Sequence, residues 1–174
     1  MINSYVFLSL VLALLAGALI GLERSYHGRA AGMRTYALVC LGSTLVMVAS
    51  FYTGGSSRPL TGLDLADPNF TRVIQGIVTG IGFLGAGVIV KEGLSVRGLT
   101  TAASIWVTAG IGILIGIELY VVAAVATLLT LATLSIFRQI EDRMPTQSYL
   151  HCYMRFRVEE TMDEDSLRSL ISNL

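Results

Sequence analysis

Five stretches of this chain carry no Asp, Glu, Lys or Arg, and each is long enough to cross a lipid bilayer. They run over residues 1–22, 35–57, 73–90, 98–117 and 119–137. A helix needs roughly 17–25 apolar residues to span the hydrocarbon core of a membrane. Charged residues make up only 14% of the chain, against about 25% in soluble domains. The sequence therefore predicts an all-α integral membrane domain with five transmembrane helices.

The charge-free stretches also predict the limits of this domain. We expect spans near residues 4–22, 35–52, 72–91, 99–117 and 119–138, inside a membrane domain over residues 1–145. A cleaved secretory signal is the alternative for the first stretch, but its opening residues, MINSYVF, contain no Lys or Arg. Between the fourth and fifth spans only Gly116 and Glu118 interrupt the apolar run, which predicts a tight helical hairpin.

Basic residues are distributed unevenly between the two sides of the predicted membrane domain. Seven fall on one side and two on the other: Arg24, Arg29, Arg34, Lys91, Arg97, Arg138 and Arg143 against Arg58 and Arg72. Cytoplasmic loops carry an excess of Lys and Arg. We therefore expect the N-terminus outside and the C-terminus in the cytoplasm. The net charge of zero gives no indication of a nucleic-acid partner.

Residues 146–174 have a different pattern, which predicts the start of an α+β segment. Apolar residues alternate from Tyr149 to Val158, as in a half-buried strand. Asp163 can then cap a helix whose apolar residues recur with helical spacing up to Leu174. One strand and one helix cannot bury a core, so this segment is either incomplete or docks on a partner. The two cysteines, Cys40 and Cys152, predict no disulfide framework.

The third charge-free stretch contains GIVTGIGFLGAG, residues 76–87, in which five of twelve residues are glycine. A G-x-G-x-x-G is present, but a dinucleotide site needs a preceding strand and a later acidic residue. In lipid, small residues instead allow helix backbones to approach closely. We predict a tight bundle or a homo-oligomer seam, with a dimer favoured. The predicted packing residues are Gly76, Gly80, Gly82, Phe83, Gly85, Gly87, Gly110 and Gly112.

A sharper alternative is a helix that unwinds around a substrate, as in transporters with broken helices. The polar or amphipathic residues available for it within the spans are Gln75, Thr79, Thr100, Thr101, Ser104 and Trp106. Ser and Thr also cap and bridge helices, so packing remains the competing interpretation of these positions.

Charged residues gather in the predicted cytoplasmic loops, and we call six of them the charged collar: Glu23, Arg24, Arg29, Arg34, Lys91 and Arg97. Arginines there suit a positive-inside loop, but a carboxylate at a helix end near lipid usually has a partner. The two interpretations of Glu23 are a structural ion pair and a ligand or proton site.

Three blocks of the sequence resemble the MgtC/SapB family. They are GALIGLERSYHGRAAGMRTYALVCLGS, RVIQGIVTGIGFLGAGVIVKEG and VRGLTTAASIWVTAGIGILIG, which together cover most of residues 17–116. The resemblance implies five spans and a cytoplasmic ACT-like domain, of which residues 149–174 look like the opening strand and helix. The positions that match the family pattern are Glu23, Arg24, Arg29, Gly32, Arg34, Thr35, Gly76, Gly80, Gly82, Phe83, Gly85, Gly87, Thr100, Thr101 and Trp106.

The resemblance also implies a function. Members support bacterial growth at low magnesium and survival inside macrophages, by binding inner-membrane partners such as the F-type ATP synthase. The alternative is a magnesium or other ion transporter. Mg²⁺ is usually held through carboxylates, and none lies in the middle of a predicted span. We expect no enzymatic activity, metal site or cofactor, since His27 and His151 read as solvated residues and no hydrolase motif occurs.

Overall fold

The computed structural model describes residues 4–53, 68–93, 95–141 and 143. The chain divides into two compact units, Met1–Asp142 and Arg143–Leu174. All the described residues except Arg143 belong to the first unit. The predicted strand and helix of residues 149–174, and with them the ACT-like segment, lie outside the described residues.

The regular secondary structure of the described part of the first unit is helical apart from one short hairpin. Its elements are α1 (Ser4–Tyr26), α2 (Met33–Thr53), α3 (Pro68–Gly87), β1 (Val90–Glu92), β2 (Ser95–Arg97), α4 (Leu99–Gly116), α5 (Tyr120–Ala132), the π-helical turn η1 (Thr133–Phe137) and α6 (Arg138–Glu141). In the described part of the chain, five helices are long and apolar enough to cross a membrane, the last being continuous over Tyr120–Glu141. The prediction of five membrane-capable helices is confirmed. Their orientation in the membrane stays a prediction.

The largest differences from the expected spans lie at the ends of α1 and α3. Helix α1 continues beyond residue 22 to Tyr26, so Glu23 and Arg24 are helical residues and not loop residues. Helix α3 ends at Gly87, short of the expected boundary at residue 91, and an antiparallel hairpin follows. Its strands pair Val90 with Arg97, and Gly93 has a positive φ of 60° near the turn, a conformation that glycine adopts readily. We had expected only a loop here.

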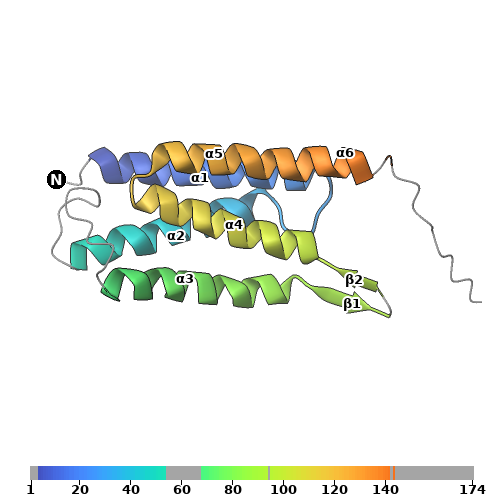
Figure 1. Cartoon of the computed structure of the whole chain (residues 1–174), viewed down its shortest axis with the longest axis horizontal. Helices are drawn as coiled ribbons and strands as arrows, with labels where there is room; N and C mark the ends of the chain where they lie inside the picture. Colours follow the sequence, from blue (N-terminus) through green and yellow to red (C-terminus); the bar gives the residue numbers. More distant parts are fainter. Residues whose placement is uncertain (1–3, 54–67, 94, 142, 144–174) are drawn as a thin grey trace, which may run out of the picture. The chain divides into compact units, whose positions relative to one another are not determined.

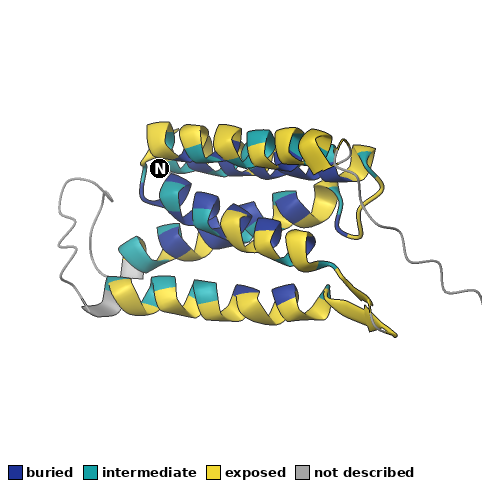
Figure 2. Ribbon diagram, turned by 45° about the vertical axis from the view of Figure 1, so that its right-hand side comes forward, coloured by how far each residue is buried: buried dark blue, intermediate teal, exposed yellow. Residues whose placement is uncertain are grey.

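The five long helices pack in a defined order (Figure 1). Helix α1 lies beside α2 and α5, while α4 contacts α2, α3 and α5 and so occupies the middle of the unit. The largest fully buried side chains include Ile20, Tyr36, Met47, Ile105 and Ile111. Helix α3 packs on α4 and α2 and leaves much of its other side exposed (Figure 2).

Glycines allow α2 to approach both α1 and α4 closely. A Cβ atom on Gly21 of α1 would lie 2.5 Å from the Cα atom of Met33. On α4, a Cβ atom on Gly112 would meet the carbonyl oxygen of Cys40. The Thr44 hydroxyl donates a hydrogen bond of 2.7 Å to the carbonyl oxygen of Gly112 at the same crossing. Small residues thus bring these helices together, as is typical of helices in lipid.

The connection between α4 and α5 is a tight turn. Glu118 has a positive φ of 64°, which is uncommon for a residue other than glycine. Its backbone N–H bonds to the carbonyl oxygen of Ile115, and that of Leu119 bonds to Leu114. These hydrogen bonds end α4 in a tight turn, and α5 begins directly afterwards at Tyr120. The predicted helical hairpin is confirmed.

Candidate functional site

Two oppositely charged side chains are buried together in the last turn of α1. The Arg24 side chain is 6% exposed and that of Glu23 is 9% exposed, with 3.8 Å between Arg24 Nη1 and Glu23 Oε2. Arg24 Nη2 also donates a long hydrogen bond of 3.5 Å to the hydroxyl of Thr101, at the start of α4. Removing charges from water costs several kcal/mol per ion unless partners compensate. This pair therefore stands out as a candidate for either structure or function.

Glu23 is only partly compensated by its neighbours. His27 Nδ1 lies 2.9 Å from both the carboxylate Oε1 and the backbone carbonyl oxygen of Glu23, but only the carbonyl meets the geometry of a hydrogen bond. None of the described residues donates a hydrogen bond to either carboxylate oxygen. The His27 side chain is 27% exposed, so it is partly accessible to solvent. His151 lies outside the described residues.

A chain of hydroxyl groups continues from this pair into the bundle. The Tyr36 hydroxyl of α2 lies 2.6 Å from Ser104 Oγ, and Ser104 Oγ donates a 3.0 Å bond to the carbonyl oxygen of Thr101. A serine hydroxyl has one proton to donate. Tyr36 must therefore be the donor to Ser104. This chain ties α2 to α4 next to Arg24.

A cavity of about 880 Å³ opens beside Arg24 at the same end of the bundle. Four segments form its wall: the end of α1 with the following loop, the hairpin, the first turn of α4, and η1 with α6. The charged residues among the described lining are Arg24, Arg29, Glu92, Arg97, Arg138 and Glu141. Residues up to 117 positions apart in the chain thus line one cavity.

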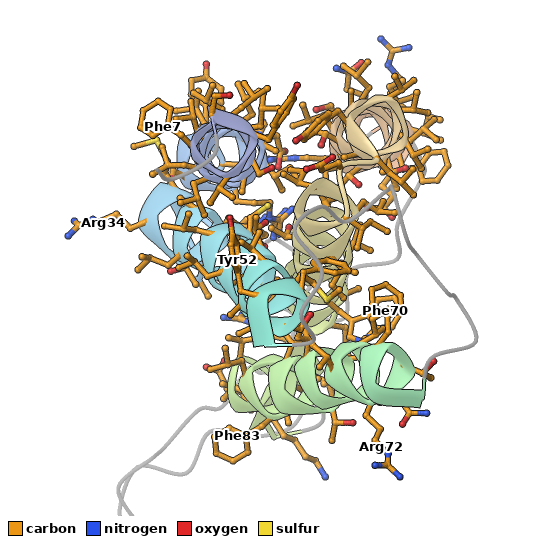
Figure 3. The ribbon with its side chains drawn as sticks, turned by 90° about the vertical axis from the view of Figure 1, so that its left-hand side faces the viewer. Phe7, Arg34, Tyr52, Phe70, Arg72 and Phe83 are labelled. Carbon is orange, nitrogen blue, oxygen red and sulfur yellow. The ribbon has the colours of Figure 1, made fainter. Side chains whose placement is uncertain are left out.

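The structure separates the charged collar into two groups. Arg24, Arg29 and Arg97 line the cavity, and Glu23 lies behind Arg24. Arg34 projects outward from the start of α2 (Figure 3), and Lys91 is exposed on β1 without lining the cavity. Glu23 Oε2 lies 3.8 Å from Arg24 Nη1 without a hydrogen bond between them, and both interpretations of Glu23 stay predictions.

The predicted packing glycines also fall into two groups. Within the described chain, no heavy atom lies within 4 Å of a Cβ placed on Gly76, Gly80, Gly82, Gly87 or Gly110. Gly85 is in ordinary contact with Ala102, at 3.7 Å, and Gly112 is tightly enclosed. Phe83 is 82% exposed and points away from the bundle (Figure 3). Within the described residues, the four open α3 glycines therefore pack against no other element, and the homo-oligomer seam stays a prediction.

The six predicted polar intramembrane residues do not meet at one place. Thr101 and Ser104 are buried in the hydroxyl chain, and Thr100 lines the cavity. Gln75 and Thr79 are exposed on the same helix as the open glycines, and Trp106 is 52% exposed on α4. Helix α3 is unbroken from Pro68 to Gly87, so the described chain contains no unwound segment within it.

Sequence reasoning did not assign a site role to Tyr36 or Arg138. Tyr36 lies shortly after the first arginines and near the start of a predicted helix. A polar residue at such a position is only a weak indication of a functional site. Arg138 entered only the count of basic residues, and its position on the cavity wall depends on the fold. Across the described residues, no three His, Cys, Asp or Glu side chains gather in a way that could hold a metal ion.

These features define a multi-pass helical membrane protein with a buried ion pair and an arginine-lined cavity at one end. The model of the MgtC family matches residues 10–143. The chain therefore belongs to the MgtC family. No solved structure gives a significant match.

Named relatives agree with this assignment. Protein MgtC of Brucella abortus (strain 2308) is 45% identical over 136 residues, covering 78% of this chain and 52% of the relative. Protein MgtC of Salmonella typhimurium (strain LT2) is 43% identical over 137 residues, covering 79% and 54%. A protein of Escherichia coli (strain K12) named "Putative magnesium transporter YhiD" is 41% identical over 140 residues, covering 80% and 64%. The chain thus spans between about half and two thirds of the length of these relatives.

Proposed function

We propose that this protein is a regulatory protein of the bacterial inner membrane that supports adaptation to low magnesium and survival inside host cells. It acts by binding other membrane proteins, with the F-type ATP synthase as the favoured partner, and it self-associates as a dimer. The family assignment supports the magnesium connection, because relatives carry the names MgtC and magnesium transporter.

One observation supports the binding mechanism: none of the described residues covers the glycine-rich outer face of α3. Gly76, Gly80 and Gly87 are exposed there, with no described atom within 4 Å of their Cβ positions. Gln75 and Thr79 are also exposed and adjoin the glycines in the sequence. A lipid-facing helix gains little from such residues, whereas a second helix can pack against them and accept hydrogen bonds from them.

The charged collar fits this mechanism as an anchor. Arg29, Arg34 and Arg97 are exposed at one end of the bundle, where arginines suit the cytoplasmic surface of a membrane. Their placement would hold α3 at a constant depth and present its bare face to a partner in the same bilayer.

The experiment compares Gly80→Leu with Ala124→Leu. Ala124 is an exposed small residue on α5, so its replacement adds the same bulk to a different membrane-facing surface. We expect both variants to fold, because neither position is buried. In inverted vesicles containing F-type ATP synthase, wild type and Ala124→Leu should lower ATP-driven proton pumping, while Gly80→Leu should not. Equal activity of the two variants would remove α3 from the mechanism.

Magnesium transport is the second candidate, favoured by the name of the Escherichia coli relative, "Putative magnesium transporter YhiD". Purified protein in liposomes loaded with a magnesium-sensitive dye distinguishes the two functions. The regulatory proposal expects no saturable flux of Mg²⁺ or H⁺ above empty liposomes. Saturable Mg²⁺ flux would replace it with the transporter.

A further inference from the structure

The cavity beside Arg24 has the charge of an anion site. Its described lining carries four arginines and two glutamates. One of the glutamates, Glu92, is paired with Arg97 at 3.3 Å, and both side chains are more than half exposed. An exposed pair of this kind contributes about 0–1 kcal/mol and can rearrange easily. With Glu23 next to Arg24, the described groups in and beside the cavity carry four positive and three negative charges, so the balance is positive by one.

Arg24 is the residue that distinguishes this cavity from an ordinary positive surface. Its side chain is 6% exposed, so it does not extend into solvent or headgroups as a topology-determining arginine would. A guanidinium has five N–H donors. Within the described part of the chain, Nε has no hydrogen-bond partner, and the bond from Nη2 to Thr101 is long, at 3.5 Å. The Glu23 carboxylate, 3.8 Å from Nη1, accepts no hydrogen bond from Arg24, so the guanidinium can donate to an acceptor that enters the cavity.

The first turn of α4 adds a second source of positive potential. Gly98, Leu99, Thr100 and Thr101 all line the cavity. Gly98 is the N-cap and has no side chain to accept a hydrogen bond from the turn. The free N–H groups and the dipole of an 18-residue helix favour an anion at this point.

The backbone conformation of Gly98 brings the hairpin and the start of α4 to the same side of the cavity. Its φ of 93° lies in the left-handed region, and a Cβ atom there would meet the carbonyl oxygen of Val88. The chain can therefore turn from β2 directly into α4 while the residues after α3 pass beside it. This close crossing places Arg97 and the start of α4 on the same wall.

Much of the remaining lining of the cavity is apolar. Together with the arginines and the start of α4, this lining indicates which kind of anion the cavity can hold. Val88, Val90, Leu99, Leu134 and Phe137 contribute to the lining. Guanidinium groups and helix N-termini both match phosphate oxygens. A volume of about 880 Å³ falls in the range of roughly 300–1,000 Å³ typical of small-molecule sites. Basic pockets between membrane helices are also known to take lipid head groups.

We propose that this cavity binds a phosphate group, carried either by an anionic phospholipid or by a soluble phosphate compound, with Arg24, Arg138 and the first turn of α4 as its ligands. The proposal concerns a site separate from the α3 face and does not depend on the function proposed above. Loss of partner binding and loss of phosphate binding are therefore distinguishable outcomes.

The test uses the full chain in nanodiscs, two variants of cavity arginines and one control variant. Arg138→Gln removes a cavity arginine, and Arg29→Gln removes one at the exposed mouth in case the first variant does not fold. Arg34→Gln is the control, because Arg34 projects outward from the start of α2 and is absent from the described lining of the cavity. Circular dichroism verifies that each variant is folded.

Two probes separate the sources of the phosphate. Retention of phosphatidylglycerol over phosphatidylcholine is measured by native mass spectrometry, and pyrophosphate is titrated against protein in pure phosphatidylcholine nanodiscs. We expect one of the two probes to bind to the wild-type protein. Its binding affinity should fall about tenfold or more in a cavity variant and should change less than twofold in Arg34→Gln. Selective phosphatidylglycerol retention identifies a lipid, and pyrophosphate binding identifies a soluble ligand. Failure of both probes, or an equal loss in Arg34→Gln, overturns the proposal.

Discussion

Replacement of Gly112 by alanine should destabilise the bundle, although alanine is the better helix former. The added Cβ would meet the carbonyl oxygen of Cys40 and would lie 2.8 Å from the Cβ of Ser43. Carbon atoms prefer separations of about 3.5–4.0 Å. A backbone carbonyl cannot rotate away as a side chain can, so α2 and α4 must move apart by something like 1 Å.

The magnitude follows from three contributions. Overpacking of this kind costs about 1–3 kcal/mol. Separation of the helices also lengthens the 2.7 Å hydrogen bond from Thr44 to Gly112, which contributes about 1 kcal/mol. The higher helix propensity of alanine relative to glycine offsets about 0.5–1 kcal/mol of this loss in stability. The net expectation for Gly112→Ala is a loss of about 2 kcal/mol in the free energy of unfolding.

Gly110 provides the matched control on the same helix. No described atom lies within 4 Å of its Cβ position, so Gly110→Ala should be neutral or stabilising by up to about 1 kcal/mol. Unfolding in mixed detergent and SDS micelles can be followed by the fluorescence of Trp106, the single tryptophan of the chain. If Gly112→Ala is as stable as wild type, or if both variants lose the same stability, the packing argument is refuted.

Two further predictions concern the buried polar residues. Tyr36→Phe removes the donor to Ser104 but leaves the Ser104 bond to the Thr101 carbonyl. We therefore expect the free energy of unfolding to fall by about 0.5–1.5 kcal/mol in the same assay. An unchanged unfolding midpoint would contradict the hydrogen bond from Tyr36 to Ser104. Glu23→Gln removes the carboxylate nearest to buried Arg24 and, without phosphate or anionic lipid present, should cost about 3 kcal/mol. Full stability of Glu23→Gln would show that the carboxylate serves function and not folding.

The sequence predicted the membrane helices well because charge is excluded from the bilayer core over whole segments. The α4–α5 turn was also predictable, since Glu118 is the only charge between two apolar runs. The hairpin at Val90–Arg97 was missed, because strands of three residues are too short for an alternating pattern to emerge. The helical extension to Tyr26 was missed because charged residues were assigned to the loop.

The direction in which each glycine faces could not be predicted. Gly17 and Gly21 form a G-x-x-x-G that packs on α2, whereas Gly76 and Gly80 have the same spacing and face open space. In helices that are apolar on all sides, hydrophobic periodicity does not reveal the buried side. The cavity was equally hidden, because Arg24 and Arg138 meet only through the packing of α1, α4 and α5.

The π-helical turn over Thr133–Phe137 determines which residues face the cavity. A π turn contains one residue more than an α turn, and each residue of a helix advances about 100° around the axis. Deleting one residue in this turn would therefore rotate Arg138 and Glu141 off the wall while leaving the composition of the helix almost unchanged. In this protein, a change of length by a single position within η1 would alter the electrostatics of the cavity more than many substitutions at its rim.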